Sequence, residues 1–211
     1  MIKGIRHIIF DLGGVLFNID YQLTEQAFEK LGIENFSSIY SQLKQSSLFD
    51  ELEVGKISAT EFFSGLKETC NISSTDEELA LAWNAMLLDM PLRRLQLLQQ
   101  LRHHYDLVLL SNTNEIHEAA FNKIIEGVHG CSIAAFFDRV YYSHRMGMRK
   151  PNVEVFEIIL NENGFKAEHT LFIDDSPQHI EGAKKLGIHT IWLEKGMTVE
   201  EHIFKPKVDT E

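Results

Sequence analysis

The chain has 211 residues, of which 44% are hydrophobic, 10% aromatic and 24% charged, and this composition is typical of a folded globular protein and excludes global disorder. No stretch is long and apolar enough to predict a membrane-spanning helix. The formal net charge of −11 argues against non-specific nucleic-acid binding.

Five short apolar runs, rich in branched and aromatic side chains, are too short for helices. Runs of this kind are typical of strands buried on both faces of a parallel sheet. They are His7–Phe10, Leu107–Leu110, Val140–Tyr142, Leu171–Ile173 and Thr190–Trp192. Because helical patterns lie between them, the chain is predicted to form an α/β fold with a doubly wound parallel sheet.

The connection after the first strand is far longer than a simple crossover needs. Residues 15–90 carry 13 Asp/Glu against 4 Lys/Arg, a net of −9, whereas the rest of the chain sums to −2. Helices are predicted at Leu23–Leu31, Phe36–Leu43, Ala59–Thr69 and Thr75–Leu88. We therefore expect a catalytic core of residues 1–14 and 91–211, with an inserted helical subdomain at 15–90 whose acidity lies mainly on its solvated face.

The later connections carry clear helix signals. Apolar residues at three- and four-residue spacing predict helices over Ile116–Ile125 and Val153–Leu160. The pair Ser176–Pro177 marks another helix start. The segment 197–211 carries weak signals and is expected to be partly disordered.

Polar residues follow the predicted strands, and ligands of open α/β sheets bind at the carboxyl ends of strands. These residues are Asp11 after the first strand, Ser111 and Asn112 after the second, Lys150 before the helix that follows the third, and Asp174 and Asp175 after the fourth. Crowded carboxylates need a cation, and oxygen ligands suit Mg²⁺. A lysine and a hydroxyl beside the metal would complete a cradle for a phosphoryl group.

Four segments in this order resemble the motifs of the haloacid dehalogenase-like hydrolases, most of which are Mg²⁺-dependent phosphatases. The segments are Ile-Ile-Phe-Asp-Leu-Gly-Gly-Val-Leu (8–16), Leu-Leu-Ser-Asn-Thr (109–113), Gly-Met-Arg-Lys-Pro (147–151) and Phe-Ile-Asp-Asp-Ser (172–176). The resemblance implies a Rossmann-like core with sheet order 5-4-1-2-3. It also identifies the helical insertion with the family's α-helical cap.

The resemblance implies a role for each motif residue. Asp11 attacks phosphorus to form an aspartyl-phosphate, and Lys150 stabilises the developing negative charge. The implied magnesium ligands are Asp11, the carbonyl oxygen of Gly13, Asp174 and Asp175. The implied contacts to the substrate are Ser111, the backbone near Asn112, the N–H groups of Leu12 and Gly13, and Lys56 in the loop Glu53–Ile57, which is similar to the family's substrate-contacting cap loop.

One position departs from the family pattern. Most family phosphatases have an acid–base Asp two residues after the nucleophile, and here that residue is Gly13. Loss of acid–base catalysis costs about 10²–10⁴-fold in rate, so the substrate would need a good leaving group. Asp20 could replace the missing acid, although a helix N-cap or a hydrogen bond at the hinge of the cap is favoured over that role, and His144 is a weaker candidate.

We therefore expect a phosphatase of a small phosphorylated metabolite, and the Asp-Leu-Gly-Gly-Val pattern resembles that of sugar 1-phosphate phosphatases. A catalytically impaired phosphate-binding protein is one alternative. A haloacid dehalogenase, which needs neither the second Asp nor Mg²⁺, is another, but it would leave Asp174 and Asp175 uncompensated.

Several further residues have two open roles. Phe17, Tyr21, Phe49 and Trp83 could line a pocket or pack cap against core, and Arg145 and Arg149 could face the site or pair with surface acids. Glu51 and Glu53 would bind hydroxyl groups if they pointed inward. With two cysteines and no signal-peptide core, we expect a cytoplasmic protein that is a monomer or weak homodimer.

Overall fold

The computed structural model describes residues 1–33 and 47–204. Its strands are β1 (His7–Phe10), β2 (Asp106–Ser111), β3 (Arg139–Tyr142), β4 (Thr170–Asp174) and β5 (His189–Trp192). Its α-helices are α1 (Tyr21–Lys30), α3 (Leu48–Glu53), α4 (Ala59–Cys70), α5 (Asp76–Asn84), α6 (Leu92–Leu101), α7 (Glu115–His129), α8 (Ser143–Met146), α9 (Val153–Asn163) and α10 (Pro177–Lys184). Shorter helical turns cover Ile133–Phe136, Ala167–His169 and Val199–Ile203.

The five strands form one parallel sheet in the order β3-β2-β1-β4-β5. This is the predicted order 5-4-1-2-3 in reverse, so the sequence-based prediction of fold and topology is confirmed. His7 of β1 pairs with Asp106 of β2 on one side and with Thr170 of β4 on the other. The central position of β1 places the residue after it between the residues that end β2 and β4.

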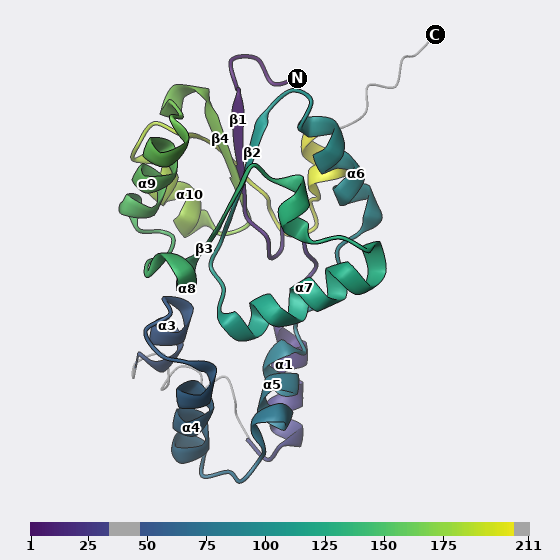
Figure 1. The fold of residues 1–211 in the computed structure, drawn as a ribbon, viewed down its shortest axis with the longest axis vertical. Coiled ribbons are helices and arrows are strands. Elements are labelled where there is room, and N and C mark those ends of the chain that lie inside the picture. The colour runs from purple at the N-terminus through teal and green to yellow at the C-terminus, as the bar shows by residue number, and fades with distance from the viewer. Residues whose placement is uncertain (34–46, 205–211) are drawn as a thin grey trace.

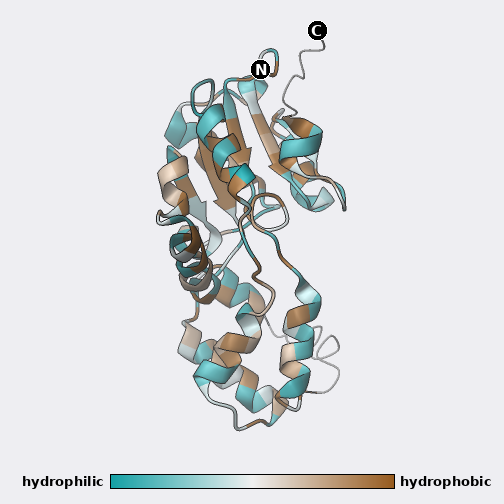
Figure 2. Cartoon of the chain, turned by 90° about the vertical axis from the view of Figure 1, so that its right-hand side faces the viewer, coloured by the Kyte–Doolittle hydropathy of each residue, from teal (hydrophilic) through white to brown (hydrophobic). Residues whose placement is uncertain are grey.

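Helices cover both faces of the sheet (Figure 1). Alternate residues of the strands are buried against these helices on opposite faces. Ile9 and Phe172 pack with Phe156 of α9 and with α10. Ile8 and Phe10 pack on the other face with α6 and α7. Figure 2 shows the strands as a hydrophobic centre between helices whose outer faces are hydrophilic. Burial on both faces explains why the central strands β1, β2 and β4 appear in the sequence as continuous apolar runs.

Helices α1, α3, α4 and α5 lie together beyond the carboxyl ends of the strands (Figure 1), and we call them the helical unit. They have an apolar cluster of their own, in which Trp83 contacts Phe28, Phe49 and Phe62 with ring centroids 5.2–6.3 Å apart. Capping boxes at Ser58 and Thr75 start α4 and α5. The described part of the acidic stretch is therefore largely helical, as predicted.

The chain enters and leaves the helical unit along two paired segments. The Asn18 N–H donates to the Asp89 carbonyl at 2.7 Å, and the Asp20 N–H donates to the Met86 carbonyl at 2.9 Å. Buried Arg94 of α6 donates to the Asn18 side-chain oxygen at 3.0 Å and so fixes this pair of segments to the core.

Some elements differ from the sequence-based predictions. The helix predicted at Thr75–Leu88 ends at Asn84, because residues 85–90 run back toward the sheet. Val199 is buried in a helical turn, so the segment 197–204 is structured, while residues 205–211 and the helix predicted at Phe36–Leu43 lie outside the described residues. Among the described helices, none has the length and apolar character to cross a membrane.

Candidate active site

Three carboxylates meet at the carboxyl edge of the sheet. Asp11 follows β1, Asp174 ends β4, and Asp175 comes next in the chain. Each of the three offers an oxygen within 4.8 Å of those of the other two. Asp11 and Asp174 are buried and Asp175 is exposed. The neighbouring positions of β1 and β4 therefore produce the acidic cluster that the sequence predicts.

Lys150 is the cation of this cluster. It is 1% exposed, and its Nζ donates to Asp11 Oδ1 and Asp174 Oδ2, both at 2.7 Å, and to the Leu110 carbonyl at 3.1 Å. Asn112 positions the backbone of Lys150, because the side-chain amide of Asn112 accepts from the Lys150 N–H and donates to the Lys150 carbonyl, both at 2.9 Å. All three Nζ protons are thus directed at fixed acceptors.

Burial and charge shift the pKa values of the cluster in opposite directions. Burial raises the pKa of Asp11 to about 7, because it outweighs the lowering effect of Lys150. Burial also acts to raise the pKa of Asp174, but Lys150 and His179 lower it to about 2. Burial alone would lower the pKa of Lys150, and the two carboxylates raise it instead. The surroundings in the cluster therefore disfavour the negative charge of an ionised Asp11.

Charge balance and ligand type both fit a divalent cation at this cluster. Three carboxylates and one lysine leave two negative charges, and carboxylate oxygens are the donors that Mg²⁺ prefers. Gly14, at φ +74°, lets the loop after β1 approach Asp175, since an added Cβ would lie 2.3 Å from Asp175 Oδ2. The cluster can thus hold a metal ion.

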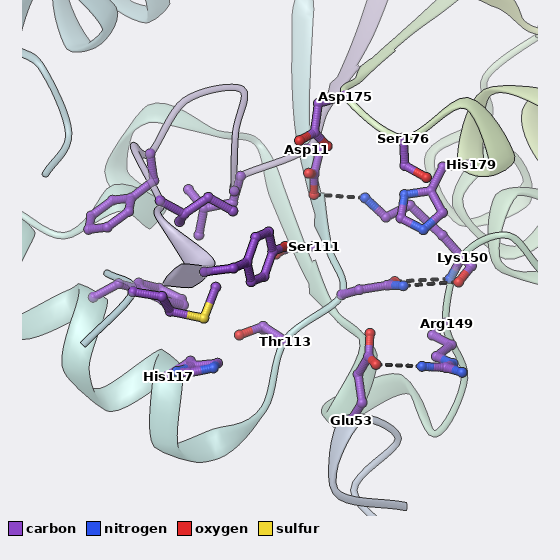
Figure 3. Close-up of a pocket in the computed structure, with 18 of the residues that line it drawn as sticks. Asp11, Glu53, Ser111, Thr113, His117, Arg149, Lys150, Asp175, Ser176 and His179 are labelled. Carbon is purple, nitrogen blue, oxygen red and sulfur yellow. Dashed lines mark hydrogen bonds and ion pairs between the residues drawn. The ribbon is translucent and has the colours of Figure 1, made fainter. Parts of the chain in front are cut away.

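The cluster opens into a cavity of about 450 Å³ (Figure 3). Its lining includes the predicted residues Asp11, Leu12, Gly13, Ser111, Asn112, Lys150 and Asp175. Asp174 is fully buried beneath them. A second cavity of about 390 Å³ shares part of this lining and is bordered by Thr24, Leu52 and Trp83 of the helical unit. The predicted core residues therefore come together in one place.

Lys56, in contrast, is exposed and does not line either cavity. Glu53, from the same predicted loop, lines both cavities and pairs with Arg149, which also contacts Asp50 at 2.8 Å. Glu51 lies outside both linings. The loop thus reaches the site through Glu53 and not through the residue that the resemblance implied.

Asp20 is an N-cap, because its side chain accepts from the Gln22 N–H at 3.0 Å, and it does not line the cavity. His144 contacts Glu118 at 2.9 Å and also lies outside the lining. Arg145 pairs with the same Glu118. Neither proposed replacement for the acid missing at Gly13 therefore faces the site.

The aromatic candidates have mixed roles. Phe17, Tyr21 and Phe49 line the first cavity, and Trp83 lines the second. Phe17 also packs in the hydrophobic core of the sheet, and Trp83 also packs among the aromatic rings of the helical unit. The space beside Gly13 is taken by Ile19, whose Cδ1 would lie 3.3 Å from an added Cβ.

Two histidines of the lining were not singled out in the sequence. His179, on the first turns of α10, lies 3.0 Å and 3.1 Å from the two oxygens of Asp174. His117, near the start of α7, is buried beside Asn84 of the helical unit. The five-residue spacing between Asp174 and His179 was an available signal, whereas the contact of His117 with residue 84 depends on the tertiary structure.

Comparisons with known proteins agree with this geometry. Residues 8–193 match the family described as "Haloacid dehalogenase-like hydrolase". The chain is 34% identical over 192 residues to the D-ribitol-5-phosphate phosphatase of Bacteroides thetaiotaomicron, covering 91% of this chain and 93% of that protein.

Solved structures of a HAD family enzyme from the same organism are also 34% identical to the chain. Its magnesium complex has a TM-score of 0.87 and covers 97% of this chain and 100% of that one. Its complex with magnesium and inorganic phosphate has a TM-score of 0.84, with 91% and 96% covered.

Proposed function

We propose that this chain, which belongs to the haloacid dehalogenase-like hydrolases and is a phosphoric monoester hydrolase, removes the phosphate from a small hydroxylated metabolite through an aspartyl-phosphate intermediate. The observation that carries the proposal is the meeting of Asp11, Lys150, Asp174 and Asp175 at one end of a cavity. The similarity to a D-ribitol-5-phosphate phosphatase supports a polyol or sugar phosphate as the substrate.

Magnesium is the cofactor of this proposal, supported by the acidic cluster and by the magnesium complex of the similar enzyme. Asp11, Asp174, Asp175 and the Gly13 carbonyl would hold it. When bound, Mg²⁺ neutralises the carboxylates and the phosphoryl oxygens. With the cation present, the negative charge at Asp11 no longer opposes the approach of an anionic substrate.

The proposed reaction uses Asp11 twice. Its carboxylate attacks phosphorus, the ester P–O bond breaks, and the leaving oxygen takes the electron pair of that bond and a proton from water, since no acid stands at position 13. Water then attacks the phosphorus of the aspartyl-phosphate, the bond to Asp11 breaks, and inorganic phosphate is released. Ser111, the backbone near Asn112, and the N–H groups of Leu12 and Gly13 hold the phosphoryl oxygens in this scheme.

Lys150 has two functions in this scheme. Its Nζ offsets the charge that develops on the phosphoryl group, and its bonds to Asp11 and Asp174 hold the nucleophile in a fixed orientation. Because Lys150 is buried, these interactions are stronger than they would be in water.

The absence of an acid at position 13, which is Gly13, favours a sugar 1-phosphate as an alternative substrate. A sugar 1-phosphate has a better leaving alcohol than a primary polyol phosphate, and it would tolerate the absence of an acid at position 13. Dehalogenation has less support, because it needs no cation and Asp174 with Asp175 would remain uncompensated.

Residues 15–90 would act as a cap over the site. Tyr21, Phe49, Glu53 and Met86, from this part of the chain, line the same cavity as Asp11. Closure over a bound substrate would exclude water from the phosphorus and set the preference for the leaving group.

The experiment compares Asp11→Asn with Asp20→Asn, a matched change at a helix cap outside the cavity. With Mg²⁺ and phenyl phosphate, Asp11→Asn should lower kcat by about 10⁴-fold or more. Asp20→Asn should keep the wild-type rate, since Asn also caps helices. EDTA should abolish the wild-type activity and added Mg²⁺ should restore it. Comparable kcat values for the two variants, or activity indifferent to EDTA, would contradict the proposal.

A further inference from the structure

His117 lines both cavities but has no part in the phosphoryl chemistry. It lies in the first turn of α7, is 8% exposed, and stacks on Trp83 with centroids 5.0 Å apart and an interplanar angle of 13°. In Figure 3 its ring lies at the opposite end of the cavity from Asp175 and Ser176. The ring therefore lies across the cavity from the acidic cluster, where a leaving group that extended into the cavity from a phosphate at Asp11 could reach it.

The contact with Asn84 determines which ring nitrogen of His117 carries the proton. Nδ1 of His117 lies 2.8 Å from Asn84 Oδ1. An amide oxygen accepts hydrogen bonds and cannot donate them, so with the Asn84 amide in this orientation Nδ1 is the protonated, donating nitrogen. In a neutral imidazole the other nitrogen, Nε2, is then a hydrogen-bond acceptor.

The surroundings keep His117 neutral. Burial lowers its pKa to about 3, and the nearby start of α7 also disfavours a positive charge. The neighbouring acids have other partners, since Glu118 bonds to His144 and Arg145, and Glu115 accepts from the Ala59 N–H. His117 therefore presents an uncharged acceptor to the cavity.

This acceptor has no protein partner within the described residues, and neither has the hydroxyl of Thr113, which lines the same two cavities. Neither is among the fully buried side-chain atoms without a partner, so both are open to the cavity. A ligand that excludes water from them leaves them unsatisfied unless it supplies a hydrogen-bonding group, and a ligand with such a group binds more tightly. A neutral acceptor beside a hydroxyl matches an alcohol O–H, whereas a plain alkyl chain leaves both atoms unsatisfied.

We propose that Nε2 of His117 accepts a hydrogen bond from a hydroxyl of the leaving group and thereby selects phosphorylated polyols over alkyl phosphates. The proposal rests on the proposed function, because it places the phosphate at Asp11. Thr113 supplies a second hydrogen-bonding group next to it, and the aromatic wall of Tyr21, Phe49 and Trp83 packs against the carbon chain.

The test uses two substrates of equal chain length, a pentitol 5-phosphate and n-pentyl phosphate, and measures the ratio of their kcat/KM values. His117→Phe keeps the ring stack but removes the acceptor, and it should lower the ratio by about 10- to 100-fold. His129→Phe makes the same change at the far end of α7, where the ring contacts the Met90 carbonyl, and should keep the wild-type ratio.

A second measurement needs no change at His117. In the Asp11→Asn protein, the ¹⁵N resonance of His117 Nε2 should shift when the pentitol phosphate binds and should not shift with n-pentyl phosphate. Equal loss of both activities in His117→Phe, or no selective shift, would overturn the proposal. Wild-type protein that hydrolyses neither substrate nor phenyl phosphate would instead overturn the proposed function.

Discussion

The residue with the most consequential environment is Asp11. It must be ionised to attack phosphorus or to bind a cation, yet burial raises its pKa to about 7. Its neighbour Asp174 has a pKa lowered to about 2 and stays ionised. Proton and metal ion therefore compete for Asp11 near neutral pH, and this competition can be measured without a substrate.

We predict that stabilisation by Mg²⁺ increases with pH. Folded protein without metal keeps a proton on Asp11 that the unfolded chain loses above its ordinary pKa, so its stability falls as the pH rises toward 7. Above that pH Mg²⁺ binds without displacing a proton, and saturating Mg²⁺ should raise Tm by roughly 5–10 °C. Thermal unfolding with and without Mg²⁺ measures this, and the rise should be much smaller near pH 5.5.

The Asp11→Asn variant serves as the control, because it cannot exchange a proton at position 11. Its smaller rise in Tm should be similar at both pH values. An equal Mg²⁺-induced rise in wild-type Tm at both pH values would show that Asp11 does not titrate in this range.

The structure also gives a steric context for the missing acid at position 13. Ile19 lies where a side chain at position 13 would project, with its Cδ1 3.3 Å from the added Cβ. An aspartate there would meet a methyl group unless Ile19 moved. The absence of the acid and the presence of Ile19 are thus compatible parts of one packing arrangement.

At the residue scale, sequence reasoning located the cluster because its three carboxylates stand at or just after the ends of strands and Lys150 belongs to a recognisable motif. It did not locate Arg149 paired with Asp50 and Glu53, or His117 beside Asn84, because these contacts join residues more than thirty positions apart. Local spacing carries no information about such pairs, so only the folded structure reveals them.

Among the elements, the turn between α3 and α4 controls how the helical unit meets the core. Gly55 has φ +67°, and a Cβ there would lie 2.1 Å from the His144 carbonyl oxygen. A glycine is therefore required both by the backbone angle and by the close approach to α8. The turn holds Glu53, two residues earlier, in the lining of the cavity.

We predict that Gly55→Ala lowers kcat/KM by about 10- to 100-fold, because displacement of α3 moves Glu53 and Phe49 away from the site. Gly164→Ala is the matched control, since Gly164 has φ +66° with nothing within 4 Å of an added Cβ. It should cost about 1–2 kcal/mol of stability from the backbone angle and leave kcat/KM unchanged. Denaturant unfolding of both variants measures the cost of the strained backbone angle, and steady-state kinetics measures the displacement of α3. Equal losses of kcat/KM in the two variants would contradict this role of Gly55.

Element prediction succeeded where a strong local signal existed. The central strands β1, β2 and β4 were located because both of their faces are buried, β3 and β5 by their branched and aromatic residues, and α7 and α9 because their apolar faces repeat at helical spacing. Helix α3 was missed because it has six residues and its N-cap, Ser47, makes no capping hydrogen bond. Helix α6 was missed although Leu92, Leu95 and Leu98 repeat at helical spacing.

At the scale of the whole molecule, the polar contacts between core and helical unit in the described residues include ion pairs, the contact of His117 with Asn84 and the bond from the Ala59 N–H to Glu115. Arg149 joins the two parts by pairing with Asp50 and with Glu53 of α3, while Arg145, nearby, pairs with Glu118 within the core. Because Arg149 is 29% exposed, its ion pairs contribute modestly to stability. Their effect should be on the relative position of the two parts.

We predict that Arg149→Leu raises KM by about three- to tenfold with a smaller change in kcat, because the site closes less readily around substrate. Small-angle scattering of the substrate-free variant should show a larger radius of gyration than wild type. Arg145→Leu should change neither KM nor the radius. An unchanged KM in Arg149→Leu would show that these ion pairs do not hold the site closed.

The sheet order could be predicted because the four motifs resemble those of a family with the order 5-4-1-2-3, which places the strands before Asp11 and Asp174 side by side. The orientation of the helical unit could not, because it depends on contacts such as Arg149 with α3 and Gly55 with His144. These contacts decide which side chains face the cavity, and thus why Glu53 lines it and Lys56 does not.

The pairing of residues 18–20 with 86–89 has a consequence for how such a protein can change. The points at which the chain departs from the core and rejoins it are one hydrogen bond apart, since the Asn18 N–H lies 2.7 Å from the Asp89 carbonyl. A tight turn could bridge them without disturbing a strand, so the intervening segment can lengthen, shorten or be exchanged at little entropic expense to the rest. The preference for a substrate can thus change through this segment while the acidic cluster and Lys150 at the edge of the sheet stay the same.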